Sequence, residues 1–479
     1  MDWSGPGAAQ PASGGEGTGA TDSGAGALSC LGQTQRCYRL HRLLLMDNQI
    51  GLLTSPAPLK MRWVMVGLAF LATVLNYVHR LSFNYLSADG DLRKLIPDDA
   101  FGYIGTAFFV AYMISNAFSG FVIDRLGTRI GYALCMAFWT SAGLIHAFAV
   151  TPLQFGVCRF LLGIGEAGNW PAAIKLTSEW FPANERSTAS GIFNSGSALG
   201  AVIVPPMVAY LGIQYGWQAT FIILAVFGYL WLAIFWFTYY TPEQSAKEAK
   251  ARIIPPLKLL KTRFVIMFTL SKTFMDPVWY FVTFWIGRYL VDVHHWDLKQ
   301  IGWYATIPFI IADVGNLVGG YFTQFIIKQG VPIPRARKVA VTIAGLIMGS
   351  SLLIGPFVIT TPLSAMFVFG MAGFGYTAYT ANSLAFPADV VPKSAAASVW
   401  GLACVGTGLG GALFQSLSGI VLKTYSATLG YTAAYNILFI GFGAVALIGL
   451  LIMLLFMGPL VKNKELHAYV DADIEPVLT

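Results

Sequence analysis

The sequence predicts an all-α membrane protein with about twelve transmembrane helices in two six-helix halves. Hydrophobic residues make up 56% of its 479 positions and charged residues 11%, whereas a typical soluble domain is roughly one quarter charged. The apolar residues gather in continuous runs that approach the roughly 20 residues needed to span a bilayer. Because backbone polar groups must be satisfied internally in hydrocarbon, such runs form helices or closed barrels, and continuous runs favour helices.

Window hydropathy orders the segments along the chain. Residues 1–60 are rich in Gly, Ala and Ser and contain no spanning run, so we expect a disordered cytoplasmic leader. We hypothesise that the part before Met46 is dispensable or reflects a misassigned start. A first half (61–239), a basic cytoplasmic loop (240–263), a second half (264–456) and a cytoplasmic tail (457–479) follow. The expected spans are 61–83, 100–122, 129–148, 153–175, 188–211, 217–239, 264–290, 299–326, 338–358, 363–385, 394–421 and 431–456.

Charge and cysteine usage narrow the class of protein. The net charge of +7 arises from Lys and Arg between apolar runs, which follows the positive-inside rule and excludes a nucleic-acid surface. The loops that carry Arg125 and Arg129 should therefore be cytoplasmic, and those that carry Asp98 and Asp292 should face the other side. An even number of spans leaves both termini in the cytoplasm. The five cysteines lack paired spacing, which indicates free thiols without a metal or disulfide role.

Ionisable residues inside spans are the main functional signal, because a buried charge at mid-bilayer costs at least about 2.5 kcal/mol. Arg80 lies toward the end of the first span, and Tyr77 precedes it by three residues on the same helical face. A guanidinium beside a hydroxyl suits a carboxylate ligand. The alternative is an anchor that snorkels to the membrane surface.

The fourth span carries Arg159 and Glu166, seven residues apart and thus on one face. Gly163, Gly165 and Gly168 allow a neighbouring helix to approach closely. A carboxyl group at this depth is suited to exchange protons near neutral pH. The alternative is a structural ion pair between Arg159 and Glu166.

Further intramembrane charges lie in the second half. Lys272 and Asp276 are four residues apart, directly before Pro277. They either neutralise each other or form a ligand site at an irregular helix. Asp313 has a structural or a coupling role. His79, in the first span, can titrate near neutrality, although a lone histidine near the end of a span is more often a satisfied polar residue.

The segment 120–129, Gly-Phe-Val-Ile-Asp-Arg-Leu-Gly-Thr-Arg, resembles the loop between the second and third helices of the major facilitator superfamily. Its glycines permit close packing, its aspartate can pair with or cap a neighbouring helix, and its arginines hold the cytoplasmic side. The motif residues with an expected gating role are Gly120, Asp124, Arg125, Gly127 and Arg129.

Within that superfamily, the chain resembles the anion:cation symporter family, and most of all its bacterial hexuronate transporters, over roughly residues 60–460. The segments that carry this resemblance are Asn76 to Arg80, Arg159 with Gly163, Gly165 and Glu166, Ser178 to Pro182 with Glu185 and Arg186, Phe193-Asn194, Pro205-Pro206, Asp276-Pro277-x-Trp279, and Ala312-Asp313 ahead of Gly319-Gly320.

The resemblance implies a role for each matching residue. Arg80 would bind the substrate carboxylate beside Tyr77 and Tyr112, and Lys272, where hexuronate-type relatives tend to carry a basic residue, would favour a sugar acid. The further expected substrate contacts are Asn194, Ser197, Trp279, Asn382 and Trp400.

Proton coupling is implied in the same way. Glu166 would be the main coupling carboxyl and Arg159 would tune it, with His79, Asp276 and Asp313 as further candidates. Many family members carry an aspartate where this chain has His79, which leaves the number of coupled protons open.

The resulting expectation is a multi-pass protein of the bacterial inner membrane that takes up a sugar acid such as glucuronate or galacturonate together with protons, by alternating access. The expected partners are a small organic anion, protons and the lipid bilayer, with no cofactor, nucleic acid or obligatory protein partner. The alternatives are exchange or uniport of another organic anion, such as an aldonate or hydroxy acid, and a nutrient sensor on a transporter scaffold. The sequence has no nucleophile elbow, metal cluster or phosphate loop, so an enzyme is not expected.

Overall fold

The computed structural model describes residues 59–88, 90–181, 185–241, 256–464 and 466. From Lys60 onward these residues belong to one compact unit. All but the last two residues of the expected leader 1–60, most of the central loop and most of the tail after 457 lie outside the described residues.

The helices of the first half do not correspond one to one with the six expected spans. Two long helices each contain a break at a glycine with positive φ, Gly127 (78°) and Gly216 (83°), so each supplies two spans. Glycine adopts this left-handed conformation without a steric penalty. The helices are α2 (Leu59–Leu86), α3 (Gly90–Leu95), α4 (Asp98–Ile145), α5 (Pro152–Glu166), α6 (Asn169–Trp180) and α7 (Arg186–Thr238).

The expected fourth span, 153–175, is two helices instead of one. Helix α5 ends at Glu166 and α6 begins at Asn169. Pro171 explains the break, because a proline lacks the N–H that would bond the carbonyl of Ala167 in a continuous helix, yet it is tolerated in a first turn. The Glu166 carboxyl therefore lies at a helix end inside the bundle.

The second half supplies the other six spans. One expected span is divided into two helices, and one helix continues through a proline. The eighth span is divided between α10 and α11, where Pro308 lies in the first turn of α11. The helices are α8 (Pro256–Leu259), α9 (Arg263–His294), α10 (Leu298–Tyr304), α11 (Ile307–Lys328), α12 (Ile333–Val358), α13 (Pro362–Ser383), α14 (Phe386–Val390), α15 (Lys393–Leu429) and α16 (Tyr431–Leu451).

Of the two alternatives for Lys272 and Asp276, the one that places them at an irregular helix is not what the structure shows, because α9 continues through Pro277. Pro277 frees the carbonyl of Thr273 from its usual partner. Gly410 of α15 lies against that carbonyl, where any larger side chain would collide with it. Close packing of α15 thus accommodates the proline without a break.

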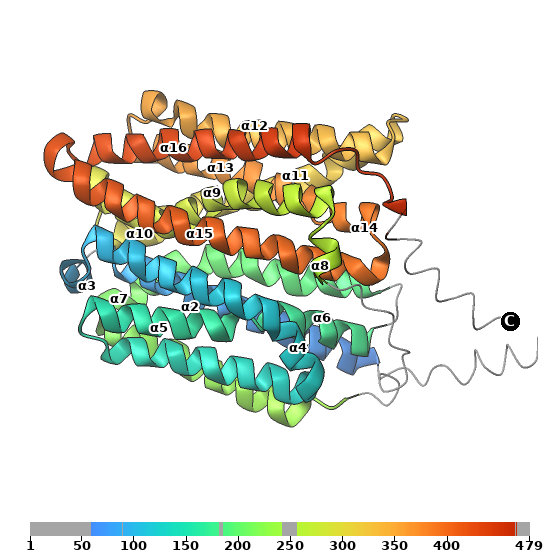
Figure 1. The fold of residues 1–479 in the computed structure, drawn as a ribbon. Coiled ribbons are helices and arrows are strands. Elements are labelled where there is room, and N and C mark those ends of the chain that lie inside the picture. The colour runs from blue at the N-terminus through green and yellow to red at the C-terminus, as the bar shows by residue number, and fades with distance from the viewer. Residues whose placement is uncertain (1–58, 89, 182–184, 242–255, 465, 467–479) are drawn as a thin grey trace, which may run out of the picture. The chain divides into compact units, whose positions relative to one another are not determined.

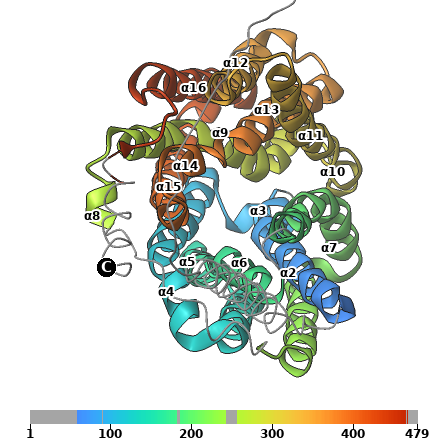
Figure 2. The ribbon, with the colours of Figure 1, turned by 90° about the vertical axis from the view of Figure 1, so that its right-hand side faces the viewer.

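By length and hydropathy, eight of the described helical segments can cross a membrane. Helices α5, α9 and α13 lie among them and complete the two six-helix halves of this all-α membrane protein. In Figure 1 the blue-to-green helices of the first half and the yellow-to-red helices of the second half run alongside one another, and Figure 2 shows the same division from the end.

The most extensive contacts between the two halves are those of α4 with α15 and of α7 with α10. In the first pair the Thr106 hydroxyl donates to the carbonyl of Ala412 at 2.8 Å. In the second, Gly302 lies against Ala209 so closely that a side chain would not fit. These glycine and threonine contacts bring the halves into backbone contact.

Candidate substrate and proton site

A buried ion pair joins α2 to the end of α5. The Nε atom of Arg80 lies 2.7 Å from Oε2 of Glu166, and Nη2 of Arg80 donates to Oδ1 of Asn76 at 3.1 Å. Arg80 is 6% exposed and Glu166 is fully buried. Arg80 is therefore held inside the bundle and does not snorkel to the surface.

Aromatic rings enclose the Arg80 guanidinium. Its central carbon lies 4.9 Å from the ring centroid of Tyr112, 5.1 Å from that of Tyr77 and 5.3 Å from that of Phe108. Cation–π contacts of this kind are strongest where water is excluded. The rings hold the guanidinium in place beside the Glu166 carboxylate. A guanidinium held in this way could also bind a second carboxylate.

Arg159 is held by contacts other than a hydrogen bond to Glu166. It donates to the backbone carbonyl of Arg80 at 2.7 Å and to Oδ1 of Asn84 at 3.2 Å. Its guanidinium lies 4.5 Å from the centroid of the Phe83 ring. The partner of Glu166 is Arg80, so the alternative of a structural Arg159–Glu166 pair is not what the structure shows. Arg159 fixes the part of α2 that carries Arg80.

The second charged pair lies on α9. Nζ of Lys272 is 2.8 Å from Oδ2 of Asp276, which also accepts a 2.5 Å hydrogen bond from Thr407 of α15. Lys272 lies 4.8 Å from the centroid of the Trp400 ring. The four-residue spacing thus produces the expected pair, and Trp400 lies beside it. Of the two Asp276 oxygens, Oδ1 has no hydrogen-bond partner among the described residues.

Two tyrosines that were not singled out from the sequence lie between the pairs. Tyr280 of α9 is within electrostatic range of both Asp276 and Arg80, and it packs on Phe109 with centroids 4.2 Å apart. Tyr376 of α13 stacks on Trp279 at 5.3 Å. Tyr280 directly follows the Asp-Pro-x-Trp segment, and this position could have indicated a site residue from the sequence. No sequence feature indicated Tyr376.

Three more expected site residues gather near Tyr77. Its hydroxyl lies beside the Ser197 side chain of α7, and Asp313 of α11 is within electrostatic range. Ser197 donates to the carbonyl of Asn194 at 2.7 Å, which places Asn194 one turn away. Ser197 therefore lies beside Tyr77, and the contacts of all three residues with a substrate stay predictions.

Asn382 and His79 lie in helix contacts. Asn382 accepts a 2.5 Å hydrogen bond from Thr323 and donates to the carbonyl of Gly319 at 3.1 Å, which ties α13 to α11. Nδ1 of His79 lies 2.9 Å from the carbonyl of Leu75, and its ring packs on Gly143. Their proposed transport roles stay predictions.

The loop motif residues lie at the break inside α4, and the positive φ of Gly127 forms the turn. Both arginines of the motif are exposed, and Arg129 donates to the carbonyl of Trp236 at 2.9 Å and stacks on its ring at 4.9 Å. Gly120 faces Pro171 of α6. The side chain of Asp124 lies outside the described part of the chain.

The glycines of α5 have the close-packing role that the sequence predicts. A Cβ at Gly165 would lie 2.7 Å from the backbone nitrogen of Trp139, whereas one at Gly156 on the same helix would meet nothing within 4 Å. We expect Gly165→Ala to destabilise the protein by about 1–3 kcal/mol. Thermal unfolding in detergent would show this as a lower midpoint.

The matched Gly156→Ala variant should be neutral or slightly stabilising, because alanine favours a helix by roughly 0.5–1 kcal/mol over glycine. Equal midpoints for the two variants would contradict the close packing at Gly165.

The chain belongs to the major facilitator superfamily, whose family model matches residues 60–415. It is 30% identical over 398 residues to the hexuronate transporter of Escherichia coli strain K12, which covers 79% of this chain and 90% of that protein. It is 31% identical to the galacturonate transporter of Dickeya chrysanthemi over 64% of this chain and 94% of that protein. A probable galactarate/D-glucarate transporter of Bacillus subtilis is 28% identical over 83% of this chain and 92% of that protein.

Solved structures show the same fold. A bacterial homologue of the human lysosomal transporter Spinster, in an inward-facing and occupied conformation, superposes with a TM-score of 0.68 at 17% identity, over 83% of this chain and 97% of that one. A D-xylose-proton symporter superposes with a TM-score of 0.66 at 14% identity, over 83% of this chain and 98% of that one. The family and its transporter relatives make the chain a multi-pass membrane transport protein and not an enzyme.

Proposed function

We propose that this protein takes up a sugar acid of the hexuronate class by proton-coupled symport across the bacterial inner membrane, with its termini in the cytoplasm. The observation that carries the proposal is the buried Arg80–Glu166 pair, in which one guanidinium serves one internal carboxylate. The names of the relatives, which are transporters of hexuronate, galacturonate and galactarate, support the substrate class.

Competition for Arg80 would couple the proton to the substrate. Protonation of Glu166 removes the charge that holds Arg80, and the substrate carboxylate then takes its place in a charge-assisted, bidentate contact. If Glu166 stayed ionised, the substrate carboxylate and the Glu166 carboxylate would share the one positive charge of Arg80. One buried negative charge would then lack a partner, which is costly. The net charge of the site is zero both when it is empty and when it holds one proton and one monoanion. The two halves can therefore rock around the site in both states.

The second half would bind the rest of the sugar. Lys272 is paired with Asp276, so it offers hydrogen bonds without a net charge, which suits hydroxyl groups more than a second carboxylate. Trp279, Tyr280 and Tyr376 supply rings and hydroxyls along the same path.

The direct test is uptake of labelled glucuronate and galacturonate into proteoliposomes under an imposed inward proton gradient. One proton per monoanion would support about tenfold accumulation for each pH unit, since one unit corresponds to about 1.36 kcal/mol. Accumulation that collapses with the gradient is the expected result. Folded protein that transports neither acid would overturn the substrate assignment.

Replacing Glu166 with glutamine should separate the proton from the substrate. We expect Glu166→Gln to retain exchange of internal for external substrate but to lose accumulation, because the amide keeps the shape of the acid and cannot release a proton. Counterflow and gradient-driven uptake, measured on the same vesicles, check this.

The control is Glu185→Gln, which alters a carboxylate that is 40% exposed and pairs with Arg62 in the same half. It should accumulate substrate as the unmodified protein does. A Glu166→Gln protein that still concentrates substrate would favour an exchanger or a uniporter driven by the membrane potential.

A further inference from the structure

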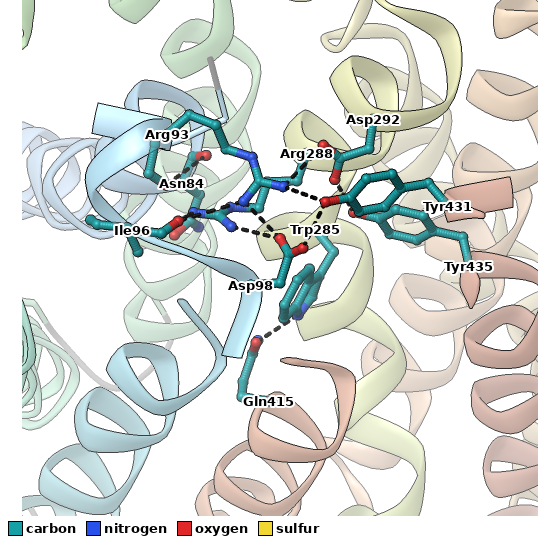
Figure 3. Close-up of polar contacts among 11 residues, drawn as sticks. Asn84, Arg93, Ile96, Asp98, Trp285, Arg288, Asp292, Gln415, Tyr431 and Tyr435 are labelled. Atoms are coloured by element: carbon teal, nitrogen blue, oxygen red, sulfur yellow. Dashed lines mark hydrogen bonds and ion pairs between the residues drawn. The ribbon is translucent and has the colours of Figure 1, made fainter. Parts of the chain in front are cut away.

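Four charged residues lie between the two halves at the end of the bundle that carries α3 (Figure 3). Arg93 of α3 and Asp98 at the start of α4 belong to the first half, and Arg288 and Asp292 belong to α9 of the second half. We call these four residues the charge seam. The sequence indicated Asp98 and Asp292 only as acidic loop residues and did not single out the two arginines.

Ion pairs across the seam join the halves. Arg93 lies 2.7 Å from Asp98 within its own half and 3.1 Å from Asp292 of the other half. Arg288 lies 2.9 Å from Asp98 and donates to the carbonyl of Ile96 at 2.9 Å. Each aspartate thus accepts a guanidinium from the opposite half, and the four charges sum to zero.

Two tyrosines of α16 complete the seam. The hydroxyl of Tyr431 donates to Oδ2 of Asp98, and that of Tyr435 donates to Oδ2 of Asp292, both at 3.1 Å (Figure 3). Arg288 is fully buried, and its guanidinium lies 4.1 Å from the centroid of the Phe101 ring. Three of the four charges are therefore almost fully shielded from water where the halves touch, and the side chain of Arg93 is 17% exposed.

The spacing within each half provides a second set of partners. Arg288 and Asp292 are four residues apart on α9, so they can pair with each other when the halves separate. Arg93 and Asp98 already pair within the first half. After separation, each half would keep one Arg–Asp pair and no unpaired charge. Two discrete arrangements of the same four residues are what a two-state element requires.

We propose that the charge seam is the gate that closes the transport path at the α3 end. It lies eight residues along α9 from Tyr280, about 12 Å at the helical rise of ~1.5 Å per residue. In the state described here, the cross-half pairs hold the gate shut. Exchange to the pairs within each half accompanies its opening, and the balance between the two sets the population of each state. The four are positioning residues, which act on the substrate site through this equilibrium.

The test measures opening without any substrate. Ala88, in the turn that follows α2, is fully buried against Gly287 of α9. In full-length protein in nanodiscs, a cysteine at Ala88 should react slowly with a bulky maleimide while the gate is closed. Asp98→Asn removes the acceptor shared by Arg93, Arg288 and Tyr431. It should raise the labelling rate above the Ala88→Cys parent at least about tenfold, because the closed state loses the contacts with Arg93, Arg288 and Tyr431, whereas the open state loses only the pair with Arg93.

The uptake readout should also change in a way that simple damage would not produce. A larger fraction of the protein would be open at the α3 end, so the apparent KM for substrate added from that side should fall. The maximal rate should fall too, because the gate closes more slowly. Arg93→Gln, which removes one pair within the half and one across it, should act in the same direction and serves if Asp98→Asn fails to fold.

The matched control is Lys423→Gln. Lys423 of the second half lies 2.6 Å from Asp99 of the first half, but the Lys423 side chain is 66% exposed. The cysteine at position 88 should therefore be labelled in the Lys423→Gln variant within about twofold of the rate in the parent. Folded Asp98→Asn and Arg93→Gln proteins with unchanged labelling would overturn the gate. So would equal effects of Lys423→Gln and Arg93→Gln.

Discussion

Replacing Arg80 with glutamine should abolish substrate uptake. The substitution removes the proposed carboxylate partner and leaves Glu166 buried without its cation. Truncating one member of a buried charge pair costs about 2–5 kcal/mol, so we expect binding to weaken at least about 30-fold. Equilibrium binding of labelled glucuronate to the purified protein measures this directly.

Arg80→Lys should recover only part of the binding. A lysine keeps the charge but loses the planar fork that binds a carboxylate in a bidentate manner. It also loses most of the stacking on Tyr77 and Tyr112. A graded series, with the arginine above the lysine and the lysine above the glutamine, would separate charge from geometry.

The control for this series is Arg62→Gln on the same helix. Arg62 lies 3.2 Å from Glu185, whose side chain is 40% exposed, so its loss should change the binding constant by less than about threefold. Unchanged binding in Arg80→Gln, with the protein folded, would exclude Arg80 as the carboxylate site.

The sequence predicted which charged residues lie buried within the spans better than it predicted their partners. A charge within a membrane span is costly, so charged residues there can be recognised from the sequence alone. This applies to Arg80, Glu166, Lys272 and Asp276. The pair on α9 is local and follows from its spacing. The Arg80–Glu166 pair joins residues 86 positions apart, and no local rule distinguishes Arg80 from Arg159 as the partner of Glu166.

The breaks in the helices show the same limit. Pro171 and Pro277 are both prolines within apolar segments, yet α6 begins just before one and α9 continues through the other. What decides between them is the neighbouring helix, since Gly410 of α15 packs onto the carbonyl that Pro277 frees. That neighbour is known only once the fold is known.

The charge seam was missed for a related reason. Asp98 and Asp292 lie at the ends of spans, where charged residues are common and carry no signal. Their burial arises only because the halves meet there, so residues that resemble solvated loop positions become paired ions. Function at the contact between two halves is therefore hard to predict from the hydropathy of either half.

A disulfide across the same contact should stop transport completely. A Cβ at Gly287 would lie 3.3 Å from Cβ of Ala88, close to the roughly 3.5–4.5 Å that a disulfide requires. We expect the double variant Ala88→Cys with Gly287→Cys to cross-link under mild oxidation, which fixes α2 to α9 and holds the gate shut. Uptake should fall to the level of empty liposomes and return on reduction.

Binding distinguishes a locked carrier from a damaged one. The cross-link holds the arrangement in which the Arg80 site is already formed, so the oxidised protein in detergent should bind substrate while its vesicles fail to transport it. Each single cysteine variant, oxidised in the same way, should transport normally. Continued uptake by fully cross-linked protein would mean that the halves need not separate at the α3 end, and alternating access through the charge seam would then be wrong.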